Sequence, residues 1–95
     1  MRTVISRRAL ADLDKIETYY TQNASLHVSR TIEQRIFEVI DHISRAPQSA
    51  PLVSRRRGTR VVPVVRFPFR IFYRYSDEMV EILHIRHTSR RALTA

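Results

Sequence analysis

The chain has 95 residues, enough for one small domain with a single hydrophobic core. It contains no cysteine, which excludes disulfide frameworks, thiolate zinc sites and cysteine nucleophiles. The formal net charge is +8, and residues 48–95 carry ten basic and three acidic side chains, against seven and six in residues 1–47. All the basic residues except Lys15 are arginines, whose planar donors suit phosphate and carboxylate, so anionic partners are predicted. An ordinary solvated basic surface is the alternative.

The amino terminus has no apolar run resembling a signal peptide, and no stretch approaches the roughly 20 apolar residues that span a bilayer. We therefore expect a soluble, cytoplasmic protein that does not bind membranes.

Two amphipathic helices are predicted after a short apolar strand at residues 3–5. Ser6 can cap the first helix, which ends near residue 23 and has apolar residues at spacings of three, three and four: Leu10, Leu13, Ile16 and Tyr20. Ser25 can cap the second, whose stripe comprises Val28, Ile32, Ile36, Val39 and Ile43, widened by Phe37 and Ile40. The short linker between them predicts an antiparallel helical hairpin.

Three strands are predicted in the second half of the chain. Residues 46–51 break the helix, and residues 54–60 form a basic loop with the only glycine. Residues 61–65 form a strand in which Pro63 indicates an edge or a bulge, and strands at 69–75 and 79–86 follow. The sequence thus predicts a single α+β domain over residues 1–95. Its order is β-α-α-β-β-β, with the helical hairpin on one face of a mostly antiparallel sheet.

Alternation along residues 69–75 assigns side chains to the two faces of this sheet. Phe69, Ile71, Tyr73 and Tyr75 fall on one face and are apolar enough to cover the helices, whereas Arg70, Phe72 and Arg74 fall on the other. Asp12, Asp14 and Glu17 are assigned to the solvated side of the first helix.

Arginine is the abundant functional side chain. If the sheet brings them together, the arginines can form a concavity that binds phosphate or carboxylate; separate solvated arginines are the alternative. The candidates are Arg55, Arg56, Arg57, Arg70, Arg74, Arg86, Arg90 and Arg91.

Two histidines near the end of the chain were considered as a metal site. His84 and His87 are three residues apart on a strand and should point to opposite faces, so no metal site is expected. His87 lies near Arg86, Arg90 and Arg91, whose charges would lower its pKa and keep it neutral, as a general base requires. A structural histidine is the alternative reading.

The segments Arg70-Ile-Phe-Tyr-Arg74, Ile82-Leu-His-Ile-Arg-His87 and Arg90-Arg91, in this order of elements, resemble the ParE/RelE superfamily of bacterial toxins over roughly residues 4–93. Resemblance to the RelE-like branch would imply a ribosome-dependent endoribonuclease that cuts messenger RNA, with Arg70, His87 and Arg90 in the catalytic roles. The carboxy-terminal tyrosine and the lysines that such enzymes carry have no counterpart here.

Resemblance to the ParE-like branch, which the Ile-Arg-His-Thr-Ser-Arg-Arg ending favours, implies a toxin that binds DNA gyrase without catalytic residues or cofactors. A neutralising antitoxin, acidic and partly disordered, is then the physiological partner. The surface expected to bind target or antitoxin comprises Arg70, Phe72, Arg74, Arg86, His87, Arg90 and Arg91. A non-toxic member that only binds its antitoxin is a third possibility.

Overall fold

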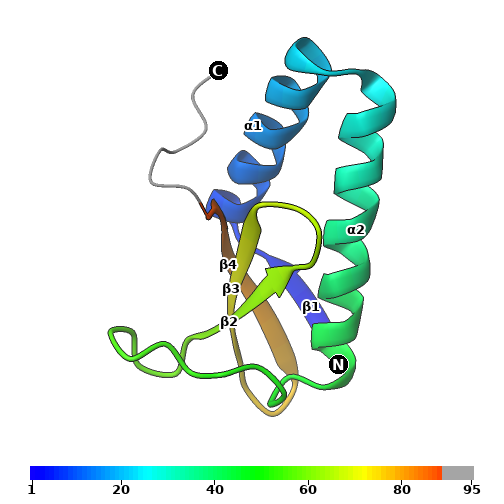
Figure 1. Ribbon diagram of the computed structural model, residues 1–95. Helices are drawn as coiled ribbons and strands as arrows, with labels where there is room; N and C mark the ends of the chain where they lie inside the picture. Colours follow the sequence, from blue (N-terminus) through cyan, green and yellow to red (C-terminus); the bar gives the residue numbers. More distant parts are fainter. Residues whose placement is uncertain (89–95) are drawn as a thin grey trace.

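The computed structural model describes residues 1–88 and contains two helices and four strands (Figure 1). The order is β1 (Arg2–Ile5), α1 (Arg7–Asn23), α2 (Leu26–Arg45), β2 (Arg60–Val64), β3 (Phe69–Tyr75) and β4 (Met79–His87). This is the predicted β-α-α-β-β-β α+β fold. None of the helices in this part of the chain is both long and apolar enough to cross a membrane.

Serine caps start both helices, as predicted. The Ser6 hydroxyl accepts a hydrogen bond from the Ala9 amide at 3.0 Å, and the Ser25 hydroxyl accepts one from Val28 at 3.1 Å. Each cap satisfies an amide that has no partner within its helix, which is worth about 1 kcal/mol.

The sheet has the strand order β1-β4-β3-β2. Two of its pairings, β2–β3 and β3–β4, are antiparallel, and β1 runs parallel to β4. Strand β2 lies at an edge, as Pro63 indicated, and its Val61 amide donates to the Pro51 carbonyl at 3.2 Å. Pro63, two residues on, has no amide hydrogen to offer to another strand, which protects this edge from pairing with a second chain.

One core lies between the helices and one face of the sheet. Figure 1 shows α2 on one side of the sheet, while the loop between α2 and β2 projects on the other. The largest fully buried side chains include Phe69, Ile71 and Tyr73 of β3, which confirms the predicted alternation. Tyr75 was assigned to the same buried set, but it is exposed and its ring lies under the Arg60 guanidinium at 5.5 Å.

The helical stripes are narrower than the sequence spacing predicted. Ile16, Ile32, Ile36, Val39, Ile40 and Ile43 are buried, whereas Leu10, Val28 and Phe37 are exposed. The sheet has four short strands and covers only part of each helix, so apolar residues at the margins of the stripes remain at the surface.

A bulge in β4 joins the sheet to α1. Tyr73 pairs with Ile82 and Phe72 with His84, so Leu83 is an extra residue on β4. Its carbonyl accepts the Ser6 hydroxyl at 2.7 Å, and the Ile85 amide donates to Asp12 Oδ2 at 2.9 Å. The assignment of Asp12 to the solvated side of the helix was therefore wrong, because its carboxylate satisfies a strand amide beyond the end of β1.

Replacing Asp12 by alanine should lower the free energy of unfolding by about 1 to 3 kcal/mol, because the partly buried Ile85 amide would lose its acceptor. Chemical denaturation measures the change. Asp14→Ala is the control: Asp14 is exposed on the same helix, and its loss should change stability by less than about 0.5 kcal/mol. Equal effects of the two substitutions would contradict the assigned role of Asp12.

Candidate docking surfaces

The sheet face turned away from the helices carries three cross-strand pairs between β3 and β4. Arg70 lies opposite Arg86, Phe72 opposite His84, and Arg74 opposite Glu81. We call this surface the outer face. It brings together four of the residues predicted for docking, namely Arg70, Phe72, Arg74 and Arg86.

The central pair of the outer face is a stack of two rings. The rings of Phe72 and His84 are nearly parallel, at 9°, with centroids 4.3 Å apart, and His84 is 4% exposed. Arg56 of the basic loop reaches the edge of this pair, with Nη1 3.2 Å from His84 Nε2. A guanidinium only donates, so Nε2 accepts and the ring is neutral with its proton on Nδ1.

Electrostatics supports the neutral state of His84. Burial lowers the pKa of its imidazole, and the positive charges of Arg8, Arg56 and Arg86 lower it further, while Asp12 acts in the opposite direction. Three cations therefore surround one buried, uncharged ring.

Acidification should destabilise the fold through His84. Its ring ionises more readily in the unfolded chain, with a pKa near 6.5, so the unfolded state binds more protons as the pH falls below this value. The stabilisation is complete above pH 6.5 and is lost as the pH falls towards the lowered pKa of the folded state. His84→Phe keeps a ring against Phe72 but cannot titrate, so its stability should depend less on pH in this window.

Thermal or urea unfolding from neutral to mildly acidic pH checks this. His27→Gln, a change at an exposed histidine of α2, is the control and should keep the pH dependence of the parent protein. A His84→Phe variant with the same pH dependence as the parent would contradict the assignment.

In the third pair of the outer face, the charge of Arg74 is neutralised by Glu81. Arg74 Nε donates to Glu81 Oε1 at 2.8 Å, across the strands. In contrast, among residues 1–88 no carboxylate forms an ion pair with Arg8, Arg56, Arg70 or Arg86.

The remaining predicted site residues lie elsewhere. His87 is opposite Phe69 on the core side of the sheet, with an edge-to-face ring contact at 5.3 Å, so it lies on the other face from Arg70. His84 and His87 thus point to opposite faces, as predicted. Within residues 1–88 no group of three His, Cys, Asp or Glu side chains could hold a metal ion. Arg90 and Arg91 lie outside the described residues.

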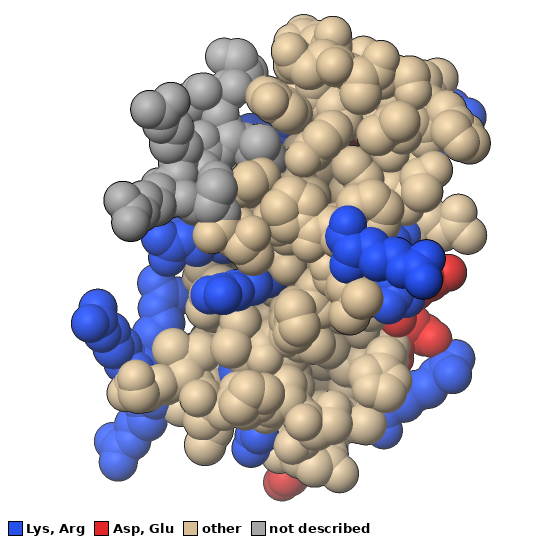
Figure 2. All heavy atoms as spheres, viewed as in Figure 1, with Lys and Arg blue, Asp and Glu red and all other residues tan. Residues whose placement is uncertain are grey.

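The contact between Arg56 and His84 on the outer face is not evident from the sequence. Arg56 belonged to a run of three equivalent arginines, and only the fold of residues 53–59 distinguishes it. That loop closes through bonds from Val53 N to Thr59 O at 2.7 Å and from Thr59 N to Arg56 O at 3.1 Å. Gly58 adopts a φ of 71° there, which suits glycine. In Figure 2, basic side chains gather on the side of the molecule where this loop projects.

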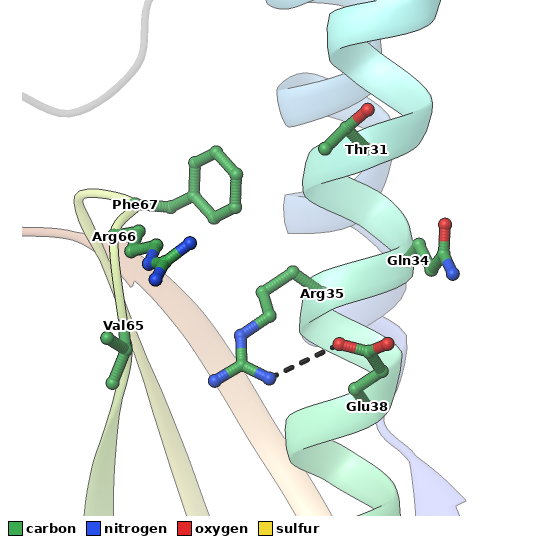
Figure 3. Close-up of a pocket in the computed structure, with 7 residues that line it drawn as sticks. All are labelled: Thr31, Gln34, Arg35, Glu38, Val65, Arg66 and Phe67. Atoms are coloured by element: carbon green, nitrogen blue, oxygen red, sulfur yellow. Dashed lines mark hydrogen bonds and ion pairs between the residues drawn. The ribbon is translucent and has the colours of Figure 1, made fainter.

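A second candidate surface is a groove of about 570 Å³ between α2 and the turn that joins β2 to β3 (Figure 3). We call it the α2–turn groove; it is lined by Thr31, Gln34, Arg35, Glu38, Val65, Arg66 and Phe67. Phe67 packs partly on the core, and Val65 is 56% exposed. Figure 3 shows Arg35 and Arg66 reaching toward the same space from opposite walls, and Arg35 is paired with Glu38 at 3.2 Å. The groove therefore combines exposed apolar surface with the positive charge of Arg66, while the charge of Arg35 is matched by Glu38.

Arg66 has a backbone conformation that non-glycine residues rarely adopt, with a φ of 77°. Replacing Arg66 by glycine should raise the free energy of unfolding by roughly 1 kcal/mol, because strain is relieved at some cost in unfolded-state entropy. Denaturant unfolding checks this, with Arg57→Gly in the exposed loop as the control. A destabilised Arg66→Gly variant would contradict the claim that an arginine is strained here.

Known proteins share this fold. The family model described as "ParE toxin of type II toxin-antitoxin system, parDE" matches residues 4–92. The chain is similar to a solved structure described as the chromosomal ParDE TA system from P. aeruginosa. Identity is 27%, the TM-score is 0.84, and the match covers 94% of this chain and 97% of the other. It shares its fold with the YoeB dimer from Staphylococcus aureus, at 18% identity and a TM-score of 0.62, over 88% and 92% of the two chains. A search of curated proteins found no match.

Proposed function

The chain belongs to the ParE family of toxins from type II toxin–antitoxin systems, and on that premise we propose that it inhibits DNA gyrase by binding and that a cognate antitoxin neutralises it in the cytoplasm. The observation that carries this proposal is the outer face, where Arg70, Arg86 and Arg56 surround a closed Phe72–His84 stack. Such a surface offers positive charge around a rigid pair of rings, to which another protein can bind.

The geometry of the histidines favours binding over catalysis. Nε2 of His84 is occupied by the Arg56 guanidinium at 3.2 Å, so it has no free lone pair with which to take a proton from a ribose hydroxyl. The set suggested for a ribonuclease is divided by the sheet, with Arg70 on the outer face and His87 on the core side. In a ribonuclease, the general base His87 and the phosphate-binding Arg70 would have to act on one substrate from opposite faces of the sheet.

The α2–turn groove suits the antitoxin. A partly disordered segment that folds on binding needs exposed apolar surface to offset its loss of entropy, and Val65 and Phe67 supply it. Arg66 on the turn wall matches an acidic partner and would help to steer it into the groove, whereas Arg35 on the other wall is already paired with Glu38 at 3.2 Å. The outer face would thus bind gyrase, and the α2–turn groove would bind the antitoxin.

Inducible expression in bacteria tests the proposal. Expression of the chain alone should arrest growth and induce the DNA-damage response while protein synthesis continues in the first minutes. Co-expression of the neighbouring acidic reading frame should restore growth. An immediate block of translation with cleaved messenger RNA would overturn the gyrase proposal in favour of a ribonuclease, and unaffected growth would indicate a member that only binds its antitoxin.

A further inference from the structure

We propose that the outer face is a binding site for the phosphodiester backbone of DNA, formed by Arg56, Arg70 and Arg86 around the buried His84. The choice of DNA rests on the proposed function, because gyrase acts on DNA. The site itself is inferred from the unbalanced charges described below.

The first observation is the pair of arginines that lie directly opposite each other across β3 and β4. Like charges in this position destabilise a sheet. At the other end of the face the same two strands place opposite charges across from each other, and Arg74 forms an ion pair with Glu81 at 2.8 Å. Arg70 and Arg86 are both exposed and, within residues 1–88, have no such partner. An anion that bridges the two guanidinium groups would supply the missing charge.

The second observation is that a third arginine reaches the same place from another element, and that the start of α1 lies beside it. Arg56 comes from the loop before β2 and contacts His84 Nε2 at 3.2 Å, and the Ser6 hydroxyl at the start of α1 donates to the carbonyl of Leu83, next to His84, at 2.7 Å. Arg8 lies in the first turn of α1, which contains no acidic residue. Cations are disfavoured at this positive end of the helix dipole, whereas an anion there is stabilised. Asp12 is the single carboxylate among the groups that act on His84.

The third observation separates nucleic acid from an acidic protein segment. Within the face, apolar contact is limited because Phe72 is stacked on His84 and Arg56 donates to the edge of the His84 ring. A protein segment that folds on binding needs apolar surface, and the exposed Val65 and the half-buried Phe67 line the α2–turn groove instead. A phosphate backbone needs guanidinium donors and little else, which is what the outer face offers.

DNA binding by the purified full-length chain tests the inference. Fluorescence anisotropy with a short labelled duplex, repeated over a series of salt concentrations, gives the slope of log affinity against log salt. Removing two phosphate contacts in Arg70→Ala/Arg86→Ala should reduce this slope by about 2 and weaken binding at low salt by about 10-fold or more. Arg56→Ala is a change in an exposed loop and should reduce the slope by about 1. It tests the same site if the double variant does not fold.

The matched control is Arg30→Ala/Arg45→Ala, which removes the same charge from exposed positions on α2. Its slope should stay close to that of the parent protein. If both double variants lost DNA affinity and salt slope equally, the site would be overturned, because DNA binding would then depend on the net charge of the protein alone. Failure of the parent protein to bind DNA, or Arg70- and Arg86-dependent binding of an acidic antitoxin segment in its place, would overturn it too.

Gyrase supercoiling, measured with the same variants, distinguishes this inference from the proposed function. Salt-dependent DNA binding that is lost in Arg70→Ala/Arg86→Ala supports the site even if the parent protein leaves gyrase unaffected, and the proposed function alone would then fail. Full gyrase inhibition by a variant that no longer binds DNA would overturn the DNA site, and with it the use of Arg70 and Arg86 in docking to gyrase, while gyrase inhibition itself would stand.

Discussion

Replacing Phe69 by alanine should destabilise the fold by about 3 to 5 kcal/mol, the typical cost of removing a buried aromatic ring. Phe69 is 0% exposed, at the start of β3, and its ring contacts Tyr20 of α1 and His87 of β4 edge-to-face at 6.1 and 5.3 Å. It thus joins a helix and two strands in one cluster. A protein of this length has a total stability of about 5 to 14 kcal/mol, so the loss removes a large share of it.

Thermal and chemical unfolding measure this effect. Phe37→Ala makes the same chemical change on α2, where the ring is 43% exposed, and it should cost well under half as much. A mild effect of Phe69→Ala, comparable to that of Phe37→Ala, would contradict the placement of Phe69 at the centre of the core.

The second large effect concerns the antitoxin. Val65→Glu should weaken antitoxin binding by about 30-fold or more, the loss of a strong interface position. Val65 is exposed at the α2–turn groove, and a glutamate there replaces apolar contact by a carboxylate that faces an acidic partner. Isothermal titration calorimetry with the cognate antitoxin measures the change.

Leu52→Glu is the matched control for Val65→Glu. Leu52 is 60% exposed and apolar, and it does not line the groove, so the same charge change there should alter the affinity by no more than a few-fold. Equal losses from the two substitutions, or none from Val65→Glu, would exclude the groove as the antitoxin site. Gyrase inhibition by Val65→Glu should be unchanged, because the groove and the outer face are separate surfaces.

The sequence predicted the elements of this fold well because their signals are local. Ser6 and Ser25 cap helices through contacts three residues away, and Phe69, Ile71 and Tyr73 alternate within one strand. These patterns are decided by neighbours in the chain. The resemblance to the ParE/RelE superfamily, based on the strand motifs, was confirmed by the family match.

What the sequence did not predict depends on contacts between distant residues. The bulge at Leu83 is held by Ser6 and Asp12, more than seventy positions earlier in the chain, with bonds of 2.7 and 2.9 Å. Arg60 looked like part of the basic loop, yet its guanidinium donates to the Ala50 carbonyl at 2.6 Å and covers Tyr75. Periodicity assigns a face to a residue but cannot say which loop folds over it, so the contact of Arg56 with His84 was not predictable.

Formation of gyrase–DNA cleavage complexes in vitro is the direct test of whether this toxin acts on gyrase. Purified toxin added to gyrase and plasmid DNA should inhibit supercoiling and accumulate cleaved DNA bound to the enzyme, while messenger RNA on ribosomes stays intact under the same conditions. Cleavage of ribosome-bound messenger with no effect on gyrase would contradict the account.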